Sequence, residues 1–85
     1  MRLVFRRAAE KALDRIPADR RRQLLTRIKD VAADPASRDF DIKPLAGSDV
    51  LRLRVGEYRI LFTVDERDDL LMVQSIRTRG DVYKR

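Results

Sequence analysis

Hydrophobic and polar residues follow two different spacings along this chain, and the change near residue 42 divides it into two halves. Before that point, apolar residues recur every three or four positions, which is the spacing of one face of an α-helix. After it, apolar and polar residues alternate singly, which is the pattern of a β-strand with one buried face. The pattern therefore predicts a mostly helical first half and a strand-rich second half.

The first half predicts one short strand followed by two helices. Residues 2–6, "RLVFR", are apolar and β-prone. A first helix is expected over 6–16, and a second begins at Pro17, because proline is tolerated at the first helical position; "DPAS" (34–37) ends it. The apolar faces are expected to comprise Ala9, Leu13 and Ile16 in the first helix and Leu24, Leu25, Ile28, Val31 and Ala32 in the second. The short break between the helices predicts an antiparallel hairpin.

The second half predicts a meander of three strands, over residues 49–55, 58–64 and 70–77. Gly56 and Glu57 form a tight turn between the first two strands, and the acidic stretch "DERDD" (65–69) joins the second to the third. The resulting order is β-α-α-β-β-β. We expect an α+β fold in which the N-terminal strand and the helical hairpin pack on one face of a small antiparallel sheet.

Single-residue alternation assigns each strand residue to one face of that sheet. The face toward the helices is expected to comprise Tyr58, Ile60, Phe62 and Val64, with Met72 and Ile76 from the last strand. The opposite face is expected to comprise Arg52, Arg54, Arg59, Leu61, Val73, Ser75, Arg77 and, at the end of the last strand, Arg79. Arginines from three strands would therefore share one surface, and guanidinium groups bind phosphate well.

Charge and composition support a phosphate-bearing partner. The chain has 85 residues, which fits a single domain spanning 1–85, and it carries 20 Lys and Arg against 14 Asp and Glu, a net charge of +6. Only four of the basic residues are lysines. A basic surface that serves solubility alone is the simpler alternative.

The missing residue types exclude several kinds of chemistry. With no cysteine and no histidine, the chain cannot form disulfides, thiolate or zinc-type sites, or a histidine proton shuttle. Most of its clustered carboxylates fill the 65–69 turn, where solubilising charge explains them, so we expect neither metal nor cofactor. No apolar segment reaches the roughly 20 residues of a membrane-spanning helix, and a cytoplasmic location is the default expectation.

Two segments resemble a known family. "PLAGSDVLRLRVGEYRILFTV" followed by "IRTRGDVYKR" is similar to toxins of the RelE/ParE superfamily, from bacterial type II toxin–antitoxin systems. The matching parts are the Leu-x-Gly of Leu45–Gly47, the "LRLRVGEYRILF" hairpin and the closing R-x-D-V-Y of Arg79 to Tyr83. The β-α-α-β-β-β order also agrees over essentially the whole chain.

This resemblance implies one of two toxic activities. RelE-like toxins are metal-independent endoribonucleases that cut mRNA, usually on the ribosome, whereas ParE-like toxins inhibit DNA gyrase and tend to lack the nuclease residues. In both branches a cognate antitoxin binds the toxin and blocks it, so a toxin–antitoxin hetero-oligomer is expected. The RelE-like branch is favoured because Arg59, Arg79 and Tyr83 occur together. Gyrase inhibition remains the alternative, followed by a non-toxic basic nucleic-acid-binding domain.

The resemblance also assigns roles to individual residues. The catalytic residues would be Arg59, Arg79 and Tyr83, with Arg77 as the alternative to Arg79. The RNA-binding residues would be Lys43, Arg52, Arg54 and Arg77. RelE-like enzymes often have lysines where this chain has Arg52 and Arg54, which predicts a weak nuclease or one that relies on the ribosome to align the RNA.

Structural roles for the same side chains remain open. Arg59 could pair with Glu57 or Asp69, Arg52 and Arg54 could form a solvated strand face, and Tyr83 could pack at the sheet edge. An apolar patch of Leu61 and Val73 among arginines suits an acidic, amphipathic segment, such as the disordered arm of an antitoxin.

Overall fold

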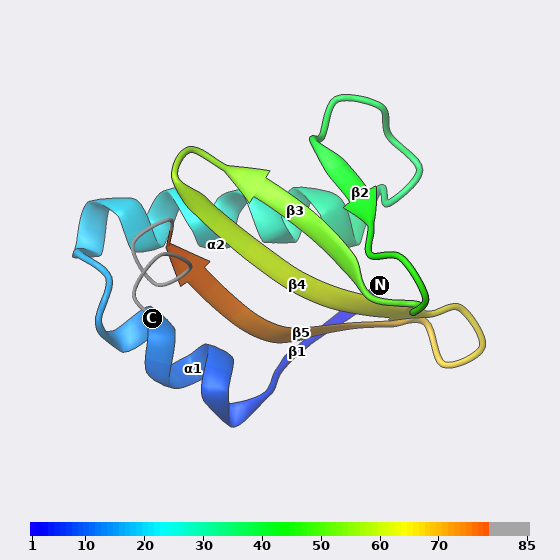
Figure 1. Ribbon diagram of the computed structural model, residues 1–85, viewed down its shortest axis with the longest axis horizontal. Helices are drawn as coiled ribbons and strands as arrows, with labels where there is room; N and C mark the ends of the chain where they lie inside the picture. Colours follow the sequence, from blue (N-terminus) through cyan, green and yellow to red (C-terminus); the bar gives the residue numbers. More distant parts are fainter. Residues whose placement is uncertain (79–85) are drawn as a thin grey trace.

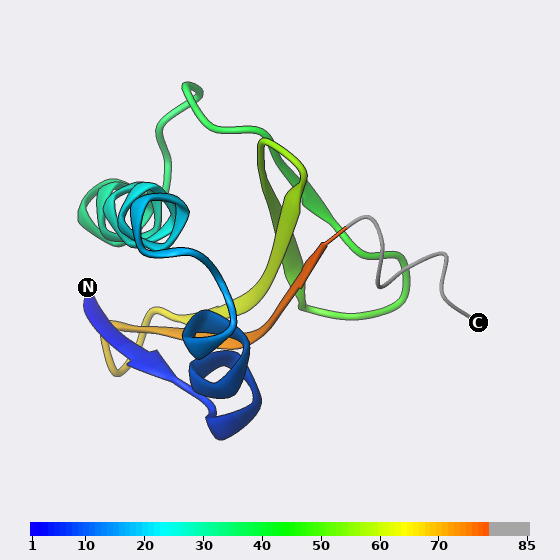
Figure 2. The ribbon, with the colours of Figure 1, turned by 90° about the vertical axis from the view of Figure 1, so that its left-hand side faces the viewer.

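The chain folds into two layers, a twisted five-stranded sheet and two helices that cover one of its faces (Figures 1 and 2). The computed structural model describes residues 1–78. The elements are β1 (Arg2–Phe5), α1 (Arg7–Asp14), α2 (Ala18–Ala33), β2 (Ile42–Pro44), β3 (Leu51–Val55), β4 (Tyr58–Asp65) and β5 (Leu70–Thr78). The α+β class is as the sequence predicts, and so is the order of the elements along the chain apart from β2. The strands lie in the order β1-β5-β4-β3-β2.

The first strand differs from the expectation. Instead of packing on a face of the sheet, β1 extends it at one edge and pairs in parallel with β5, from Arg2 opposite Leu70 to Phe5 opposite Val73. The sheet is therefore mixed rather than antiparallel. At the other edge, the short strand β2 pairs antiparallel with β3 and adds a strand that the alternation pattern did not separate from its loop.

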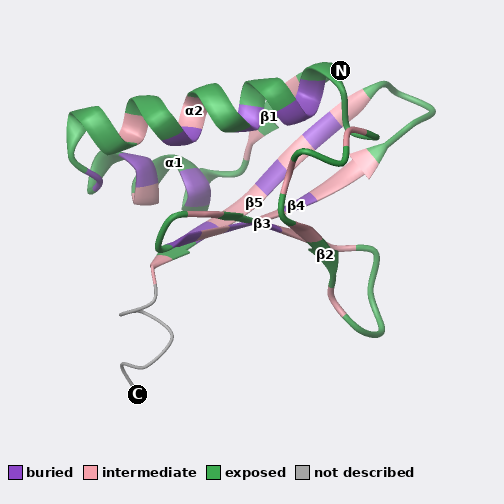
Figure 3. Ribbon diagram, turned by 90° about the horizontal axis from the view of Figure 1, so that it is seen from above, coloured by how far each residue is buried: buried purple, intermediate pink, exposed green. Residues whose placement is uncertain are grey.

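The hydrophobic core lies between the helices and the central strands. Both helices turn their buried residues toward the sheet (Figure 3). From α2, Leu24, Ile28 and Val31 are almost completely buried, as are Ile60 and Phe62 of β4. Burying one such side chain contributes about 1.5–3 kcal/mol, so this shared core supplies most of the driving force for folding. The predicted helix-facing side of β4 is confirmed, because Tyr58, Ile60 and Phe62 all belong to the core.

An irregularity in β5 reverses part of the predicted pattern. Leu61 lies opposite Ser75 and Phe62 lies opposite Val73, so Gln74 has no opposing residue on β4. One extra residue in a strand is a β-bulge. The residues of β5 that precede Gln74 in the chain therefore lie on the opposite faces from those that regular alternation predicts. Val73 is consequently 0% exposed on the helix side, while Met72 lies opposite Thr63 on the other face. The expected faces of Met72 and Val73 were therefore wrong, and those of Ser75, Ile76 and Arg77 were right.

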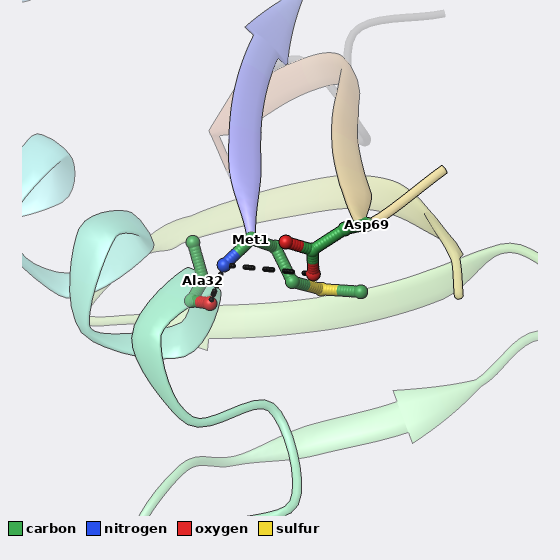
Figure 4. Close-up of polar contacts among 3 residues, drawn as sticks. All are labelled: Met1, Ala32 and Asp69. Carbon is green, nitrogen blue, oxygen red and sulfur yellow. Dashed lines mark hydrogen bonds and ion pairs between the residues drawn. The ribbon is translucent and has the colours of Figure 1, made fainter. Parts of the chain in front are cut away.

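The first residue connects three elements (Figure 4). The amine of Met1 donates a hydrogen bond to the Ala32 carbonyl oxygen at 2.9 Å and lies 4.0 Å from a carboxylate oxygen of Asp69. Ala32 is in the last turn of α2, where a positive group interacts favourably with the helix dipole. The contacts fix β1 against α2 and the β4–β5 turn. Neither helix in the described residues is long and apolar enough to cross a membrane.

Candidate nucleic-acid interface

Five basic side chains lie together on the face of the sheet away from the helices. Residues directly opposite each other in adjacent strands share a face, with Cβ atoms about 5 Å apart. One row across the sheet joins Lys43, Arg52 and Leu61, and the next joins Arg54, Arg59 and Arg77. We call this surface the basic face and define it as Lys43, Arg52, Arg54, Arg59 and Arg77. The predicted grouping of arginines from three strands is confirmed.

The β3–β4 hairpin, which carries Arg52, Arg54 and Arg59, is held in register at its turn. Gly56 has a φ of +59°, in the left-handed region that glycine adopts without strain, so β3 and β4 are joined by two residues only. Next to it, Arg20 of α2 lies 3.3 Å from a carboxylate oxygen of Glu57. The Tyr58 hydroxyl and, secondarily, the Glu57 carboxylate raise the pKa of the Arg20 guanidinium. These contacts fix the turn beside the opposed pair Arg54 and Arg59.

The carboxylates that could have neutralised Arg59 have other partners. Glu57 pairs with Arg20, and Asp69 lies near the Met1 amine. Within residues 1–78, no member of the basic face forms an ion pair. Lys43, Arg54 and Arg77 are exposed, whereas Arg52 and Arg59 are half-buried. Asp41 is a neighbouring carboxylate, since its backbone carbonyl accepts a hydrogen bond from the Arg54 N–H at 3.0 Å, but it forms no ion pair with these cations in the described chain. Adjacent cations that have no paired carboxylate create a local positive potential, which attracts phosphate groups.

The apolar part of this surface is not where the alternation pattern placed it. Val73 is buried in the core because of the bulge, so it cannot form a patch with Leu61. The apolar residues beside the basic face are instead Leu61 and Met72, both half-buried, and Val4, which is 37% exposed and lies opposite Met72. The patch therefore extends toward the β1 edge of the sheet.

Two of the predicted catalytic residues, Arg79 and Tyr83, lie outside the described residues. Arg59 is placed, and the residue directly opposite it on β5 is Arg77. Within the described part of the chain, no cluster of three or more carboxylates is positioned to hold a metal ion. The chemistry that the placed residues provide is thus electrostatic, through guanidinium groups that remain charged at neutral pH.

A groove of about 630 Å³ continues from this surface, between α1 and the end of β5. Its lining includes Lys11 and Arg15 of α1 together with Tyr58 and Arg77. Neither Lys11 nor Arg15 is singled out by the sequence pattern. Their spacing of four positions in "KALDR" places them on one side of a helix, but nothing in the sequence shows that this side meets β5.

The comparison with protein families decides the identity of the chain. Residues 3–83 match the family model of the ParE toxin of type II toxin–antitoxin systems. The chain belongs to this toxin family. The family lies within the RelE/ParE superfamily that "LRLRVGEYRILF" and "RGDVY" indicate, so the resemblance is confirmed.

Individual relatives connect this toxin to RelE as well. A protein of Methanocaldococcus jannaschii named for the toxin RelE1 is 32% identical over 76 residues, which cover 87% of this chain and 84% of the relative. The RelE–RelB complex of Pyrococcus horikoshii contains a chain 28% identical, with a TM-score of 0.80 and coverage of 93% and 94%. The toxin–antitoxin complex RelBE of E. coli, at 21% identity and a TM-score of 0.76 over 91% and 94%, shares the fold.

Proposed function

We propose that this toxin is a RelE-like endoribonuclease that cleaves mRNA and thereby inhibits translation. The observation that carries the proposal is the register of Arg54, Arg59 and Arg77, three guanidinium groups side by side with no carboxylate partner in residues 1–78. The guanidinium groups of such a row can donate charge-assisted, bidentate hydrogen bonds to the oxygens of one phosphate. The 32% identity to the RelE1-named relative supports the nuclease branch.

The proposed reaction needs no metal. The 2′-oxygen of a ribose attacks the adjacent phosphorus, the bond from phosphorus to the 5′-oxygen breaks, and the products carry a 2′,3′-cyclic phosphate and a 5′-hydroxyl. Arg59 and Arg77 would stabilise the negative charge that develops on the phosphate oxygens, usually the largest contribution in such sites. Arginine keeps its proton at neutral pH, so it is a poor proton acceptor.

The proton of the 2′-hydroxyl therefore needs another acceptor, and the 5′-oxygen needs a donor. The family resemblance points to Tyr83, either as the group that helps to deprotonate the 2′-hydroxyl or as a side chain that stacks on a nucleobase, and we keep this assignment as a proposal together with a contribution of Arg79. For the phosphate contact itself, we favour Arg77, because it lies directly opposite Arg59. Lys43, Arg52 and Arg54 would hold the flanking phosphates, with the ribosome aligning the message.

A cognate antitoxin is the second partner that we propose. The P. horikoshii and E. coli relatives were solved as complexes with RelB. The basic face and its apolar neighbours Leu61, Met72 and Val4 suit an arm that is both acidic and amphipathic. When the toxin is expressed from its native locus, its purification should recover a small co-encoded partner in a hetero-oligomer that withstands gel filtration at low salt. Separate elution of the two proteins would contradict this assignment.

The nuclease is tested by primer extension on cellular transcripts after brief induction of the toxin. We expect discrete cuts within translated regions for the wild type, and loss of these cuts for Arg59→Ala and Arg77→Ala. Arg67→Ala is the matched control, because Arg67 is an exposed arginine in the β4–β5 turn. If induction stops growth while the transcripts stay intact, the proposed nuclease activity is contradicted.

Gyrase inhibition is the alternative, because the family model that matches is that of ParE toxins. It predicts that the purified toxin blocks DNA supercoiling by gyrase in vitro while transcripts stay intact. The arginine variants would then retain toxicity, since this activity does not require a phosphate site on the basic face.

A further inference from the structure

The end of β5 has a helix rather than a strand beside one edge. β1 pairs with β5 only as far as Phe5 opposite Val73, and the chain then turns into α1. Beyond Val73, β4 flanks β5 on one side, and α1 packs along the other side. The groove of about 630 Å³ lies along this edge, and it is open to solvent.

The residues of the groove combine an apolar floor with a cationic rim. Ala8, Ala12 and Ile76 line it, together with Tyr58, which is 7% exposed, so a flat apolar group could lie against them. Lys11, Arg15 and Arg77 line the same groove, and none of the three forms an ion pair within residues 1–78. No Asp or Glu belongs to the described lining. A nucleotide combines the two groups that this groove would bind, because its base is flat and its phosphate is an anion.

Arg77 connects this groove to the basic face. It lies opposite Arg59 in the sheet and also lines the groove, so the two surfaces are continuous around the end of β5. A phosphate held between Arg59 and Arg77 would therefore have its neighbouring nucleotide at the mouth of the groove. Lys11 and Arg15 are positioned to bind the next phosphate along the strand.

We propose that the groove between α1 and β5 is a nucleotide subsite, which holds the base and phosphate next to the phosphate bound at the basic face. This inference rests on the proposed RNA-cleaving function and extends it by assigning RNA contacts to Lys11 and Arg15. A single-stranded RNA would then follow a path from Lys43 across the sheet to α1. A segment of the antitoxin is the competing occupant, but the cations, the apolar floor and the continuity with Arg59 favour RNA.

The double variant Lys11→Ala/Arg15→Ala tests the cationic rim. The probe is a single-stranded RNA of about ten nucleotides with 2′-O-methyl groups, which cannot be cleaved. We expect the affinity to fall about tenfold at about 0.1 M salt. Because Lys11 and Arg15 are assigned to one phosphate, and each lost phosphate contact on a single strand lowers the salt slope by about 0.7, the slope of log K against log salt should fall by about 0.7.

The matched control is Arg22→Ala/Lys29→Ala, which removes the same two residue types from exposed positions on α2. An equal loss of affinity in test and control variants would show a general charge effect and overturn the subsite. RNA binding and cleavage that are absent already in the wild type would overturn the proposed function and the subsite with it. If Arg59→Ala abolishes cleavage but the groove variants behave as the controls do, only the subsite fails.

A steric variant tests the floor of the groove without changing charge. Ala8 is an exposed residue of α1 that lines the groove, so Ala8→Trp should fill it and weaken RNA binding severalfold. Ala33→Trp, at the exposed end of α2, is the control and should leave the affinity unchanged. Loss of antitoxin binding in Ala8→Trp with unchanged RNA affinity would overturn the subsite and assign the groove to the antitoxin.

Discussion

The two faces of the sheet are built from the same strands but differ in burial and in charge. In β4, Ile60 and Phe62 face the helices and are buried, while Arg59 and Leu61 face the other way and are only half-buried. The buried face is stabilised by removal of apolar area from water. The basic face gains no such stabilisation and holds like charges side by side. Substitutions on one face should therefore affect folding, and substitutions on the other should affect binding and catalysis.

The largest effect should come from a change in the register of β5, which keeps its core residues on one face. Deletion of Met72 shortens β5 next to the bulge, so either Leu71 or Val73 must leave the core for the other face. We expect the protein to lose its cooperative unfolding transition in urea. Deletion of Gln74 is the control, because it removes only the extra residue of the bulge and leaves Val73 and Ser75 in regular alternation on the faces they already occupy. A Met72 deletion as stable as this control would show that the register does not hold the core residues in place.

A truncation in the core should cost less than the deletion but more than any change on the basic face. Phe62→Ala should lower the free energy of unfolding by about 3–5 kcal/mol, because it leaves a cavity among Ile28, Leu53 and Val73. Its neighbour Leu61→Ala, on the opposite face of the same strand, should lower it by about 1 kcal/mol or less. Urea titrations followed by circular dichroism measure both. Equal losses would contradict the assignment of faces.

On the basic face, Arg59→Ala should reduce the rate of RNA cleavage about 10²- to 10³-fold, the range observed for loss of one preorganised donor. Its thermal unfolding should be unchanged or slightly improved, because repulsion from Arg54 and Arg77 is relieved. Arg59→Lys keeps the charge but loses the fork-shaped donor, so it should recover part of the rate. Cleavage of a defined message in a translation extract, with melting curves alongside, checks the comparison.

Anions should stabilise the folded protein through the same face. Inorganic phosphate at about one hundred times its dissociation constant would stabilise the folded state by about 2.7 kcal/mol. We therefore expect a rise in melting temperature with phosphate, measured at constant ionic strength against chloride. The rise should be much smaller in the double variant Arg59→Ala/Arg77→Ala. The same rise in wild type and variant would place the anion elsewhere.

The smallest effect should come from the exposed pair of Arg20 and Glu57. Arg20→Ala should lower the melting temperature by no more than about 4 °C, since surface ion pairs contribute little. The pKa of Arg20 is raised in the folded protein, so its contribution is present below the ordinary arginine pKa and is lost only as pH rises through the folded value. The difference between wild type and variant should thus stay constant from about pH 6 to 9. A difference that changes across this range would show that another group titrates with the pair.

Much of the site was predictable because it depends on short-range rules. Arg52, Arg54 and Arg59 lie in two strands joined by a two-residue turn, where alternation and a fixed register place them on one face. Arg77 was also placed correctly, because it follows the bulge and shares the regular register with Arg59. The roles of Arg79 and Tyr83 depend on the family resemblance and stay a prediction.

By itself, the sequence determined the helices, the β3–β4 hairpin and the collection of arginines on one face, since all of these follow from local spacing and turn chemistry. Only the tertiary structure decided three further features: the bulge at Gln74, the parallel pairing of β1 with β5, and the contact of α1 with the end of β5. Each of these depends on packing between segments far apart in the chain. For that reason the alternation pattern assigned Met72 and Val73 to the wrong faces. For the same reason the sequence does not indicate that Lys11 and Arg15 lie in one groove with Arg77.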